Sequence, residues 1–396
     1  MFRHKQGIDV RIRHEVTELD VPQRRVLVRD LEGGDEWWEG FDLLHIATGA
    51  SPFVPAVPGA DAVGIYTVST LESGIRVKRA VDEQQPRRAV VVGGGHVGLE
   101  MVEAFLMRDM DVSVVEMMPQ VMNTLDPEMG ALVSDAVRRA GVDLYLDERL
   151  EGFEVGDDGR MRAVVTSRRT LPADIVVLGL GVRPNSDLVA RAGVPLGIRG
   201  AIRVNERMET GIEGVWAAGD CVESHHMVSR QPTYVALGTV ANKQGRVAGI
   251  NIGGGYATFP GVLGTSITKF CSLGVAQTGL RTSEIEALGL EYATAQIDGS
   301  TAAHYYPEAG KISVKVLAEK GSGRLLGGQI VAGGPPTADR ESCAFLAAKR
   351  IDILATALQA GMTVDEMLNL DLAYAPPFSP VWDPVHIAIR QVIKSL

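Results

Sequence analysis

The sequence contains few cysteines, no apolar run of membrane length and no signal-peptide core. Its three cysteines, Cys221, Cys271 and Cys343, form no C-x-x-C or C-x4-C pair. They are therefore expected to be buried thiols in a reducing compartment, and no metal site is predicted. A membrane helix needs about 20 predominantly apolar residues, and no stretch approaches that length. Together these absences predict a cytoplasmic protein without a membrane partner.

Positive charge is also in short supply. The chain carries 39 lysine and arginine residues against 49 aspartate and glutamate residues, which gives a net charge of −10. Nucleic acids and anionic membranes both require a basic protein face, so neither is predicted as a partner. Glycine is plentiful, at 45 of 396 residues, which fits many tight turns and close approaches of the backbone to phosphates. A chain of this length is sufficient for two or three domains.

The order of the predicted elements indicates an α/β protein followed by a separate α+β domain. Alternating apolar residues predict short strands from residue 8 to 47, the first over 8–12, and the prolines between 52 and 59 predict an extended linker. A helix over 71–84 then leads into a βαβ unit, which belongs to a parallel sheet. Further helices are expected at 127–140, 234–251, 340–360 and 363–370, and strands of the last domain at 265–279, 292–298, 311–318 and 324–331.

The strongest local motif is the G-x-G-x-x-G loop formed by residues 93–98. It directly follows the apolar strand 89–92 and opens a helix, which is the context that a dinucleotide site requires. Gly93 permits the tight turn, Gly95 lets the backbone approach a pyrophosphate, and Gly98 permits close packing of helix and strand. A glycine-rich turn without a ligand is the alternative. The complete strand–loop–helix context favours the dinucleotide site.

The residues after the second strand of this unit indicate which dinucleotide binds. That strand ends at Glu116, where an acidic side chain hydrogen-bonds a ribose 2′-hydroxyl. Its neighbours Met117 and Met118 supply no cation for a 2′-phosphate. NADH is therefore favoured over NADPH, although both remain open.

Two weaker signals support a second nucleotide site. Thr48-Gly49 ends one buried strand, and Gly219-Asp220 ends another. A carboxylate at the end of a strand can accept hydrogen bonds from sugar hydroxyls. Each pair alone could equally be a strand-to-loop turn with Asp220 as a helix N-cap. Their positions on either side of the 93–98 loop are the informative feature.

The order of these motifs resembles that of the pyridine nucleotide-disulfide oxidoreductases, and the resemblance extends from Phe2 to the C-terminus. Shorter stretches are similar to the branch that contains coenzyme A-disulfide reductases and NADH oxidases. The stretches that carry the resemblance are Thr48-Gly49, residues 93–98, Gly98-Leu99-Glu100-Met101, Gly181-Val182-Arg183-Pro184-Asn185, Gly219-Asp220, residues 241–246, Leu263-Gly264-Thr265-Ser266, Tyr305-Tyr306-Pro307 and residues 372–377.

The resemblance implies tandem Rossmann-like domains that bind FAD and NAD(P)H, followed by an α+β dimerisation domain. The FAD domain would comprise residues 1–71 and 188–258, the NAD(P)H domain residues 72–187 and the dimerisation domain residues 259–396. FAD and either NADH or NADPH are then the expected cofactors. The partners would be a second copy of the chain and a small disulfide substrate of the coenzyme A type.

The resemblance also implies roles for individual cofactor-binding residues. Asp220 would contact the ribityl chain of FAD, and Thr48, Gly49 and Gly219 would line the same site. NAD(P)H would bind at Gly93, Gly95, Gly98 and Glu116. His96 occupies a position that is usually an aromatic gate over the flavin.

Four further residues are implied in catalysis or substrate binding. Glu100 lies at the position of an acid near the reactive nitrogen of the flavin, and Asn242 is expected to contact the substrate. Tyr306 and Tyr374 would reach toward the active site of the partner subunit, with simple packing as the alternative role for each tyrosine.

The sequence departs from the family pattern at several positions. Family members begin with a G-x-G-x-x-G loop for the FAD pyrophosphate and a redox cysteine, and we expect residues 1–396 to lack both. Trp382 stands where a lysine is frequent, and Phe378 replaces a tyrosine. An apparent insertion lies around Pro335–Ala347. These departures predict little FAD retention and no coenzyme A-disulfide reduction by these 396 residues alone, because disulfide exchange needs a thiolate.

Three functions therefore remain open. The leading hypothesis is FAD-dependent reduction of coenzyme A disulfide, or of a related persulfide, by NAD(P)H. An NADH oxidase of the same family shares most of these motifs. The third alternative is a non-catalytic dimer that binds NAD(H).

Overall fold

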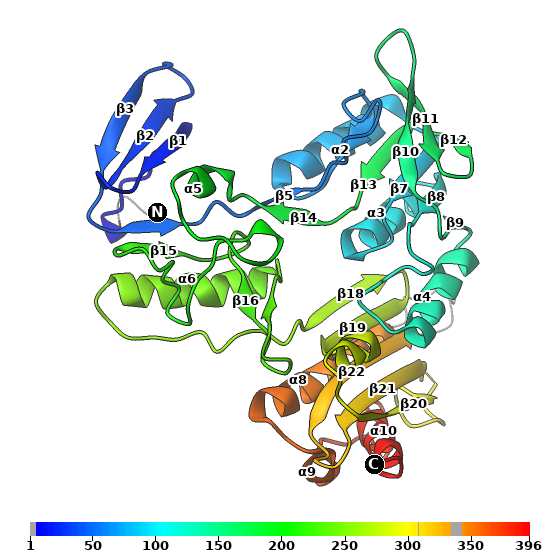
Figure 1. Ribbon diagram of the computed structural model, residues 1–396. Helices are drawn as coiled ribbons and strands as arrows, with labels where there is room; N and C mark the ends of the chain where they lie inside the picture. Colours follow the sequence, from blue (N-terminus) through cyan, green and yellow to red (C-terminus); the bar gives the residue numbers. More distant parts are fainter. Residues whose placement is uncertain (1–4, 308, 334–342) are drawn as a thin grey trace. The chain divides into compact units, whose positions relative to one another are not determined.

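The computed structural model describes residues 5–307, 309–333 and 343–396. The chain forms two compact units, and Figure 1 labels most of their elements. The sequence placed domain boundaries after residues 71, 187 and 258, whereas the main changes between units follow residues 51, 181 and 262. Unit 1 comprises Met1–Ser51, Val182–His226 and Gln231–Val262, and unit 2 comprises Pro52–Gly181, Met227–Arg230 and Leu263–Leu396.

Unit 1 begins with an antiparallel sheet in the order β1 (His14–Asp20), β2 (Arg25–Asp30) and β3 (Glu36–Gly40). The strand predicted over 8–12 is absent, and this prediction was wrong. Ile8 and Ile12 alternate with polar residues, but their side chains are 49% and 76% exposed. Alternation therefore did not mark a buried face here, because no neighbouring strand covers these residues.

The core of unit 1 surrounds two short parallel strands. In this pair, β4 (Leu44–Ile46) lies beside β15 (Val215–Ala217), so both strands end at the same edge. Buried side chains such as Ile202 and Val222 pack around them. The helix predicted at 234–251 is α6 (Gly238–Ile252). The smaller elements are β5 (Ala50–Pro52), β14 (Val182–Pro184), α5 (Asp187–Arg191), the 3-10 turn η1 (Ile198–Gly200), β16 (Ser224–His225) and β17 (Pro232–Thr233).

The first half of unit 2 is a five-stranded parallel sheet, which confirms the predicted βαβ unit. Its order is β6 (Ile65–Tyr66), β13 (Ile175–Leu178), β7 (Arg88–Val92), β8 (Asp111–Val115) and β9 (Asp143–Tyr145). The central strands are nearly continuous valine and isoleucine because both faces are buried. The accompanying helices are α2 (Leu71–Gln84), α3 (His96–Leu106) and α4 (Pro127–Arg139), and an antiparallel sheet contains β10 (Leu150–Val155), β11 (Met161–Thr166) and β12 (Thr170–Pro172).

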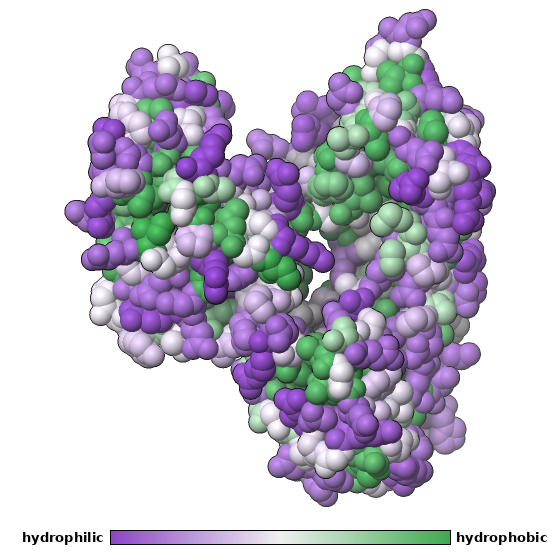
Figure 2. All heavy atoms as spheres, viewed as in Figure 1, coloured by the Kyte–Doolittle hydropathy of each residue, from purple (hydrophilic) through white to green (hydrophobic). Residues whose placement is uncertain are grey.

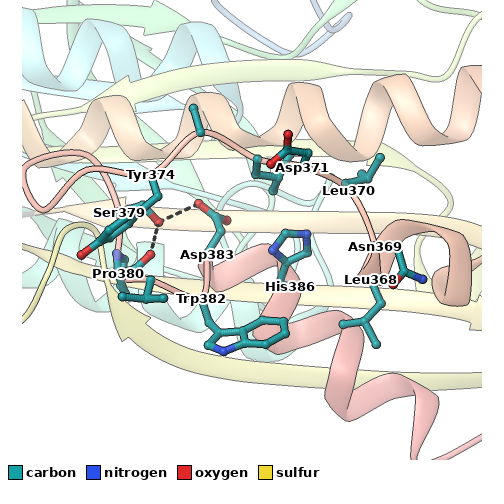
Figure 3. Close-up of a pocket in the computed structure, with 13 residues that line it drawn as sticks. Leu368, Asn369, Leu370, Asp371, Tyr374, Ser379, Pro380, Trp382, Asp383 and His386 are labelled. Atoms are coloured by element: carbon teal, nitrogen blue, oxygen red, sulfur yellow. Dashed lines mark hydrogen bonds between the residues drawn. The ribbon is translucent and has the colours of Figure 1, made fainter.

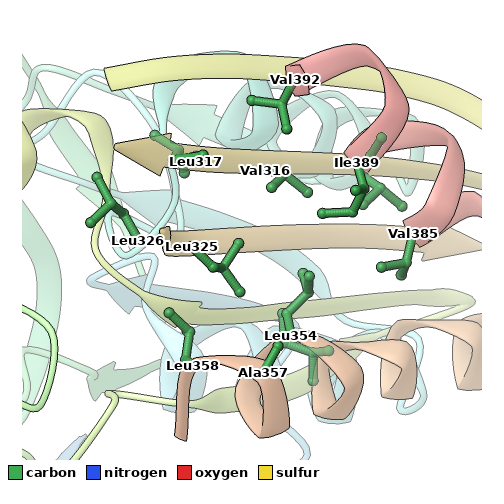
Figure 4. Close-up of a cluster of buried hydrophobic side chains, with 14 of the residues drawn as sticks. Val316, Leu317, Leu325, Leu326, Leu354, Ala357, Leu358, Val385, Ile389 and Val392 are labelled. Atoms are coloured by element: carbon green, nitrogen blue, oxygen red, sulfur yellow. The ribbon is translucent and has the colours of Figure 1, made fainter. Parts of the chain in front are cut away.

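The second half of unit 2, which we call the interface domain, is a five-stranded antiparallel sheet covered by helices. The sheet order is β18 (Ser266–Phe270), β19 (Leu273–Gly279), β22 (Leu325–Gly333), β21 (Lys311–Glu319) and β20 (Tyr292–Ser300). Figure 4 shows Leu354 of one helix and Ile389 of another directed at the apolar side chains of the strands. These helices are α8 (Ile351–Ala360) and α10 (Pro384–Ile393), and the remaining ones are α7 (Thr282–Ala287), the 3-10 helix η2 (Cys343–Arg350) and α9 (Val364–Leu368).

Two helical predictions in the interface domain need correction. The helix predicted over 340–360 is a 3-10 helix from Cys343 followed by α8, and residues 340–342 lie outside the described part, as do residues 335–342 of the predicted insertion. The sequence analysis also missed α10. That helix begins with Asp383 as N-cap, whose side chain accepts a hydrogen bond from the Val385 backbone, and Pro384 occupies its first turn.

The two halves of unit 2 share a packed and charged junction. Val133 and Val137 of α4 belong to the same buried cluster as Phe270 and Val331 of the interface-domain sheet. Beside this cluster, Lys315 of β21 forms an ion pair with Asp126 at 2.7 Å, and both side chains are at most 3% exposed. The five-stranded parallel sheet with its helices and the interface domain are therefore held together by buried apolar side chains and by a buried ion pair.

Hydrophilic and hydrophobic residues are intermingled on the face of the molecule that Figure 2 shows. Figure 2 shows hydrophobic residues in small groups among hydrophilic ones. Several large apolar side chains of the interface domain are nevertheless exposed, including Phe378 at 74% and Val381 at 73%. Within the described ranges, no helix combines the length and apolar character needed to cross a membrane.

Candidate cofactor-binding sites

The glycines of the 93–98 loop are required by close backbone contacts. A Cβ on Gly98 would lie 1.9 Å from the carbonyl oxygen of Gly93, so only glycine lets α3 approach β7 this closely. Gly93 has a φ of +104°, and a Cβ there would lie 2.5 Å from the Gly179 carbonyl oxygen. These contacts explain the first and third glycines of the motif as packing requirements.

Gly95 differs because the space next to it contains no protein atom. A Cβ at Gly95 would meet nothing within 4 Å. Gly95 is also the N-cap of α3, where no side chain caps the helix and no acidic residue lies in the first turn. The free N–H groups of an 11-residue helix therefore border open space. This arrangement fits a pyrophosphate and so the binding of NAD(P)H.

Glu116 lies beside this loop and is only 8% exposed. Its carboxylate accepts hydrogen bonds from the backbone N–H of Gly94 at 2.7 Å and of Met118 at 2.9 Å. Glu116 therefore holds the loop in place, a role that the sequence did not indicate. A carboxylate can accept further hydrogen bonds, so contact with a ribose hydroxyl stays a prediction.

Thr48 and Gly49 follow β4 in unit 1 and are fastened by Asn185. The Thr48 hydroxyl donates to the Asn185 carbonyl at 2.6 Å, and the Asn185 side-chain amide donates to the Thr48 carbonyl at 2.9 Å. The Asn185 backbone N–H also donates to the Gly49 carbonyl. Asn185 belonged to one of the motifs that carried the resemblance, but only the structure assigns it this positioning role.

Gly219 and Asp220 follow β15, the parallel neighbour of β4, so they lie at the same sheet edge. Gly219 has a φ of +89°, and its N–H donates to the Gln244 side chain at 3.0 Å. The Tyr234 hydroxyl donates to the Asp220 carbonyl at 2.7 Å, and burial raises the pKa of Tyr234 to about 12. Gln244 and Tyr234 are two further positioning residues that the sequence analysis did not identify.

The Asp220 side chain has an unsatisfied buried oxygen. Its Oδ1 atom is buried and has no hydrogen-bond partner, and burial raises the pKa of the carboxyl group. Asp220 is the N-cap of no described helix, so the alternative of a capping role is not supported. A ligand hydroxyl would satisfy Oδ1, which fits the ribityl chain expected of FAD.

Substituting Asp220 tests this interpretation without any enzyme assay. Because burial raises the folded-state pKa of Asp220, its ionisation destabilises the folded chain as pH rises above the unfolded value. Asp220→Asn should therefore raise the melting temperature of flavin-free protein at pH 8 and have little effect near pH 4. The same variant should bind FAD more weakly. Asp35→Asn, at an exposed position, is the control, and an Asp220→Asn variant less stable at pH 8 would contradict the prediction.

His96 and Glu100 lie one helical turn apart on α3. The His96 Nε2 atom is buried without a hydrogen-bond partner, and burial lowers the pKa of the imidazole, an effect that Glu100 partly offsets. Glu100 is exposed and accepts a hydrogen bond from the Thr268 hydroxyl at 2.9 Å. A neutral imidazole with a free nitrogen beside the open helix end is suited to contact a bound nicotinamide, so the gating role of His96 stays a prediction.

The two candidate tyrosines lie on neighbouring segments of the interface domain. The Ala303 backbone donates to the Pro376 carbonyl at 2.9 Å, which connects the segment of Tyr306 to that of Tyr374. Tyr374 is 47% exposed and lines a cavity of about 430 Å³ (Figure 3). Its exposure argues against simple core packing. The contact of either tyrosine with a partner active site stays a prediction.

Comparison with known proteins places the chain in a family. The family model described as "Pyridine nucleotide-disulphide oxidoreductase" matches residues 1–245, and that of its dimerisation domain matches residues 265–384. The chain belongs to this family. Its members are FAD-dependent oxidoreductases that use NAD(P)H.

Individual relatives are similar over the whole chain. An NAD(P)H sulfur oxidoreductase (CoA-dependent) from Pyrococcus abyssi is 37% identical, over 100% of this chain and 84% of the relative. An NADH oxidase from Methanocaldococcus jannaschii is 33% identical, over 100% and 85%. The solved structure of an NAD-dependent persulfide reductase from A. fulgidus matches with a TM-score of 0.92 and 40% identity, over 100% of this chain and 71% of that one.

The cysteines of this pyridine nucleotide-disulfide oxidoreductase occupy different environments. Cys221 is fully buried, as expected, and its thiol donates to the Ala218 carbonyl at 3.4 Å. The expectation of burial was wrong for Cys271, which is exposed at the β18–β19 turn with a φ of +50°. Partial desolvation and the nearby Glu103 raise the pKa of the Cys271 thiol. The side chain of Cys343 lies outside the described part of the chain.

Asn242, the predicted substrate contact, lies on the exposed face of α6. No hydrogen bond of its side chain is found within the described residues. Asn242 lies in the second turn of α6, whose N-cap residue Leu237 forms no side-chain capping hydrogen bond. The position leaves Asn242 accessible to a ligand, and its contact with substrate stays a prediction.

Proposed function

We propose that this oxidoreductase uses NADH to reduce a disulfide or persulfide that carries coenzyme A. For the disulfide, NADH and one proton yield NAD⁺ and two coenzyme A thiols, which balances as a two-electron reduction. Bound FAD would supply the hydride and electron transfer between the two substrates. The main support is the open N-terminus of α3 at Gly95 in a chain similar to a CoA-dependent sulfur oxidoreductase.

The residues of the chain would divide this work among them. The N–H groups at the start of α3 would bind the pyrophosphate of NADH, and Glu116 would orient the adenosine ribose. Met117 and Met118 are 61% and 43% exposed and carry no positive charge, so a 2′-phosphate would gain no ion pair there. NADH is therefore the preferred donor. Asp220 would accept a hydrogen bond from FAD through its free Oδ1 atom.

Neither of the two described thiols is suited to attack a disulfide. The reaction requires a thiolate that the substrate can reach. Cys221 is inaccessible, and the raised pKa of Cys271 disfavours its thiolate. We therefore infer that the nucleophilic thiol is neither Cys221 nor Cys271.

A direct assay separates the candidate reactions. The sequence predicts that residues 1–396 alone do not reduce coenzyme A disulfide, and an assay of FAD-loaded protein tests the proposed function against that prediction. Oxidation of NADH with release of two thiols for each NADH would support the proposed function and refute the prediction from the sequence. The rates of Cys221→Ser and Cys271→Ser should stay within about twofold of the parent rate. NADH consumption matched by oxygen uptake, without thiol release, would favour the NADH oxidase activity carried by another similar protein. Loss of thiol release in either serine variant would identify that cysteine as the nucleophile.

We also propose that the interface domain forms a homodimer. Residues 265–384 match the family's dimerisation domain, and this region exposes Phe378, Val381 and Trp382. Exposed apolar groups of this kind are typical of protein interfaces. Light scattering at micromolar concentration should give twice the chain mass. Val381→Asp should shift the equilibrium toward monomer, whereas Asp365→Asn, at an exposed position in the same domain, should not.

A further inference from the structure

The register of the interface-domain sheet brings the ends of four strands to one level. Leu273 of β19 lies opposite Gly333 of β22, Gly333 lies opposite Lys311 of β21, and Lys311 lies opposite Ser300 of β20. Strand pairing alone therefore places a basic side chain and a hydroxyl group at the same sheet edge.

A cavity of about 740 Å³ opens at this edge, and we call it the sheet-edge cavity. Its sides include Arg139 from the last turn of α4, Cys271 from the β18–β19 turn and His304 from the segment after β20. Leu132 and Leu273, which also line it, are only partly buried and give it an apolar surface. The volume lies within the range of roughly 300–1,000 Å³ that is typical of sites for organic ligands.

The charged groups around the cavity leave an excess of positive charge. Lys311 and Arg139 are exposed, and neither forms an ion pair or a side-chain hydrogen bond within the described residues. The carboxylate among the lining residues is Asp135, which already pairs with Arg138 at 3.4 Å. The ring of His304 contacts Tyr305 edge-on. These two cations line one cavity in a chain whose net charge is −10.

Hydroxyl groups complete the lining. Ser272, Ser300 and Ser313 face the same cavity, and the Ser313 hydroxyl donates to Asp298 at 2.5 Å. Ser272 and Ser300 make no side-chain hydrogen bond within the described part of the chain, so they remain available to a ligand. An ammonium, a guanidinium and hydroxyl donors are the groups that bind phosphate oxygens.

We propose that the sheet-edge cavity binds an organic phosphate. Its phosphate would lie between Lys311 and Arg139, and its apolar part would cover Leu132 and Leu273. Inorganic phosphate would gain the charges but not the apolar contacts, and a neutral lipid-like molecule would gain only the contacts. The site is built from residues that take no part in the proposed reaction, so it is independent of that function.

Cys271 provides a reporter for this binding because its accessible thiol lines the cavity. The experiment measures alkylation of Cys271 by N-ethylmaleimide at pH 8, resolved by peptide mass spectrometry. NADH is present at saturation so that the 93–98 loop is occupied. Octyl phosphate should slow alkylation at least fivefold. Inorganic phosphate or octanol, at the same concentration, should slow it less than twofold.

Matched variants then test the two cations. Lys311→Ala/Arg139→Ala should abolish the protection by octyl phosphate, whereas Arg76→Ala/Lys320→Ala, at exposed positions outside the cavity lining, should retain it. Each single substitution, Lys311→Gln or Arg139→Gln, should weaken octyl phosphate binding at least fivefold in calorimetry. The alkylation rate without ligand reports on folding and should stay within twofold in every variant. Equal protection in the double variant, or none in the parent protein at millimolar octyl phosphate, would overturn the proposal.

Discussion

Replacing Gly95 with leucine is expected to weaken NADH binding about 100-fold, or roughly 2.7 kcal/mol, without unfolding the protein. The leucine side chain would extend into the space next to α3, where no protein atom lies within 4 Å of a Cβ. It would therefore occupy the space of the pyrophosphate, while its Cβ would contact no other atom of the chain. The measurement is isothermal titration calorimetry with NADH, together with a melting curve of the unliganded protein.

The control for this prediction is Gly74→Leu. Gly74 is also a glycine of unit 2 whose Cβ would meet nothing within 4 Å, but it lies inside α2 rather than at a helix N-terminus. Its substitution should leave NADH affinity unchanged. Unchanged affinity in Gly95→Leu would show that the dinucleotide binds elsewhere.

Replacing Lys315 with methionine is expected to destabilise unit 2 by about 3–5 kcal/mol, because it leaves a buried carboxylate without its cation. Lys315 pairs with Asp126 at 2.7 Å and also contacts Glu128, while the Asp126 carboxylate accepts two hydrogen bonds from Thr282. Both members of the Lys315–Asp126 pair are almost fully buried. Thermal unfolding followed by circular dichroism should show the loss as a lower midpoint.

The double variant Lys315→Met/Asp126→Asn distinguishes charge from packing. Removal of both charges should recover much of the lost stability, since the ion that then remains unpaired is Glu128, whose side chain is 46% exposed rather than buried. Lys320→Met, at an exposed position of the same domain, should change the midpoint little. If the double variant is less stable than Lys315→Met by the full effect of Asp126→Asn alone, the two charges do not interact.

Local signals allowed much of unit 2 to be predicted from the sequence. The helix over 71–84 agrees with α2 because Thr70 and Ser73 form a capping box at its start. At α10, Asp383 is the N-cap and Pro384 is the first helical residue, and apolar residues follow at helical spacing. These start signals could have revealed the missed helix. Over residues 8–12, the alternation of apolar and polar residues indicated a strand, but no neighbouring strand pairs with this segment. The sequence of a single segment does not show whether a partner strand exists.

The candidate sites also differ in how far they could be predicted from local sequence. The three glycines of the 93–98 loop could be assigned roles because the strand, loop and helix are consecutive. The contact between Thr48 and Asn185 spans 137 positions, so nothing near either residue indicates it. The exposure of Cys271 was missed because cysteine is usually buried, whereas this residue lies in a tight turn with positive φ.

The junction inside unit 2 has a consequence for modularity. A fragment of residues 52–181 would retain the 93–98 loop but would lose Phe270 and Val331, which complete its apolar cluster. In this fragment, the Asp126 carboxylate would also lose its ion pair with the ammonium group of Lys315. The dinucleotide-binding half therefore cannot be exchanged between proteins as an independent module. A recombinant protein joined at residue 181 would need new residues that cover the apolar cluster and a new cation that pairs with Asp126.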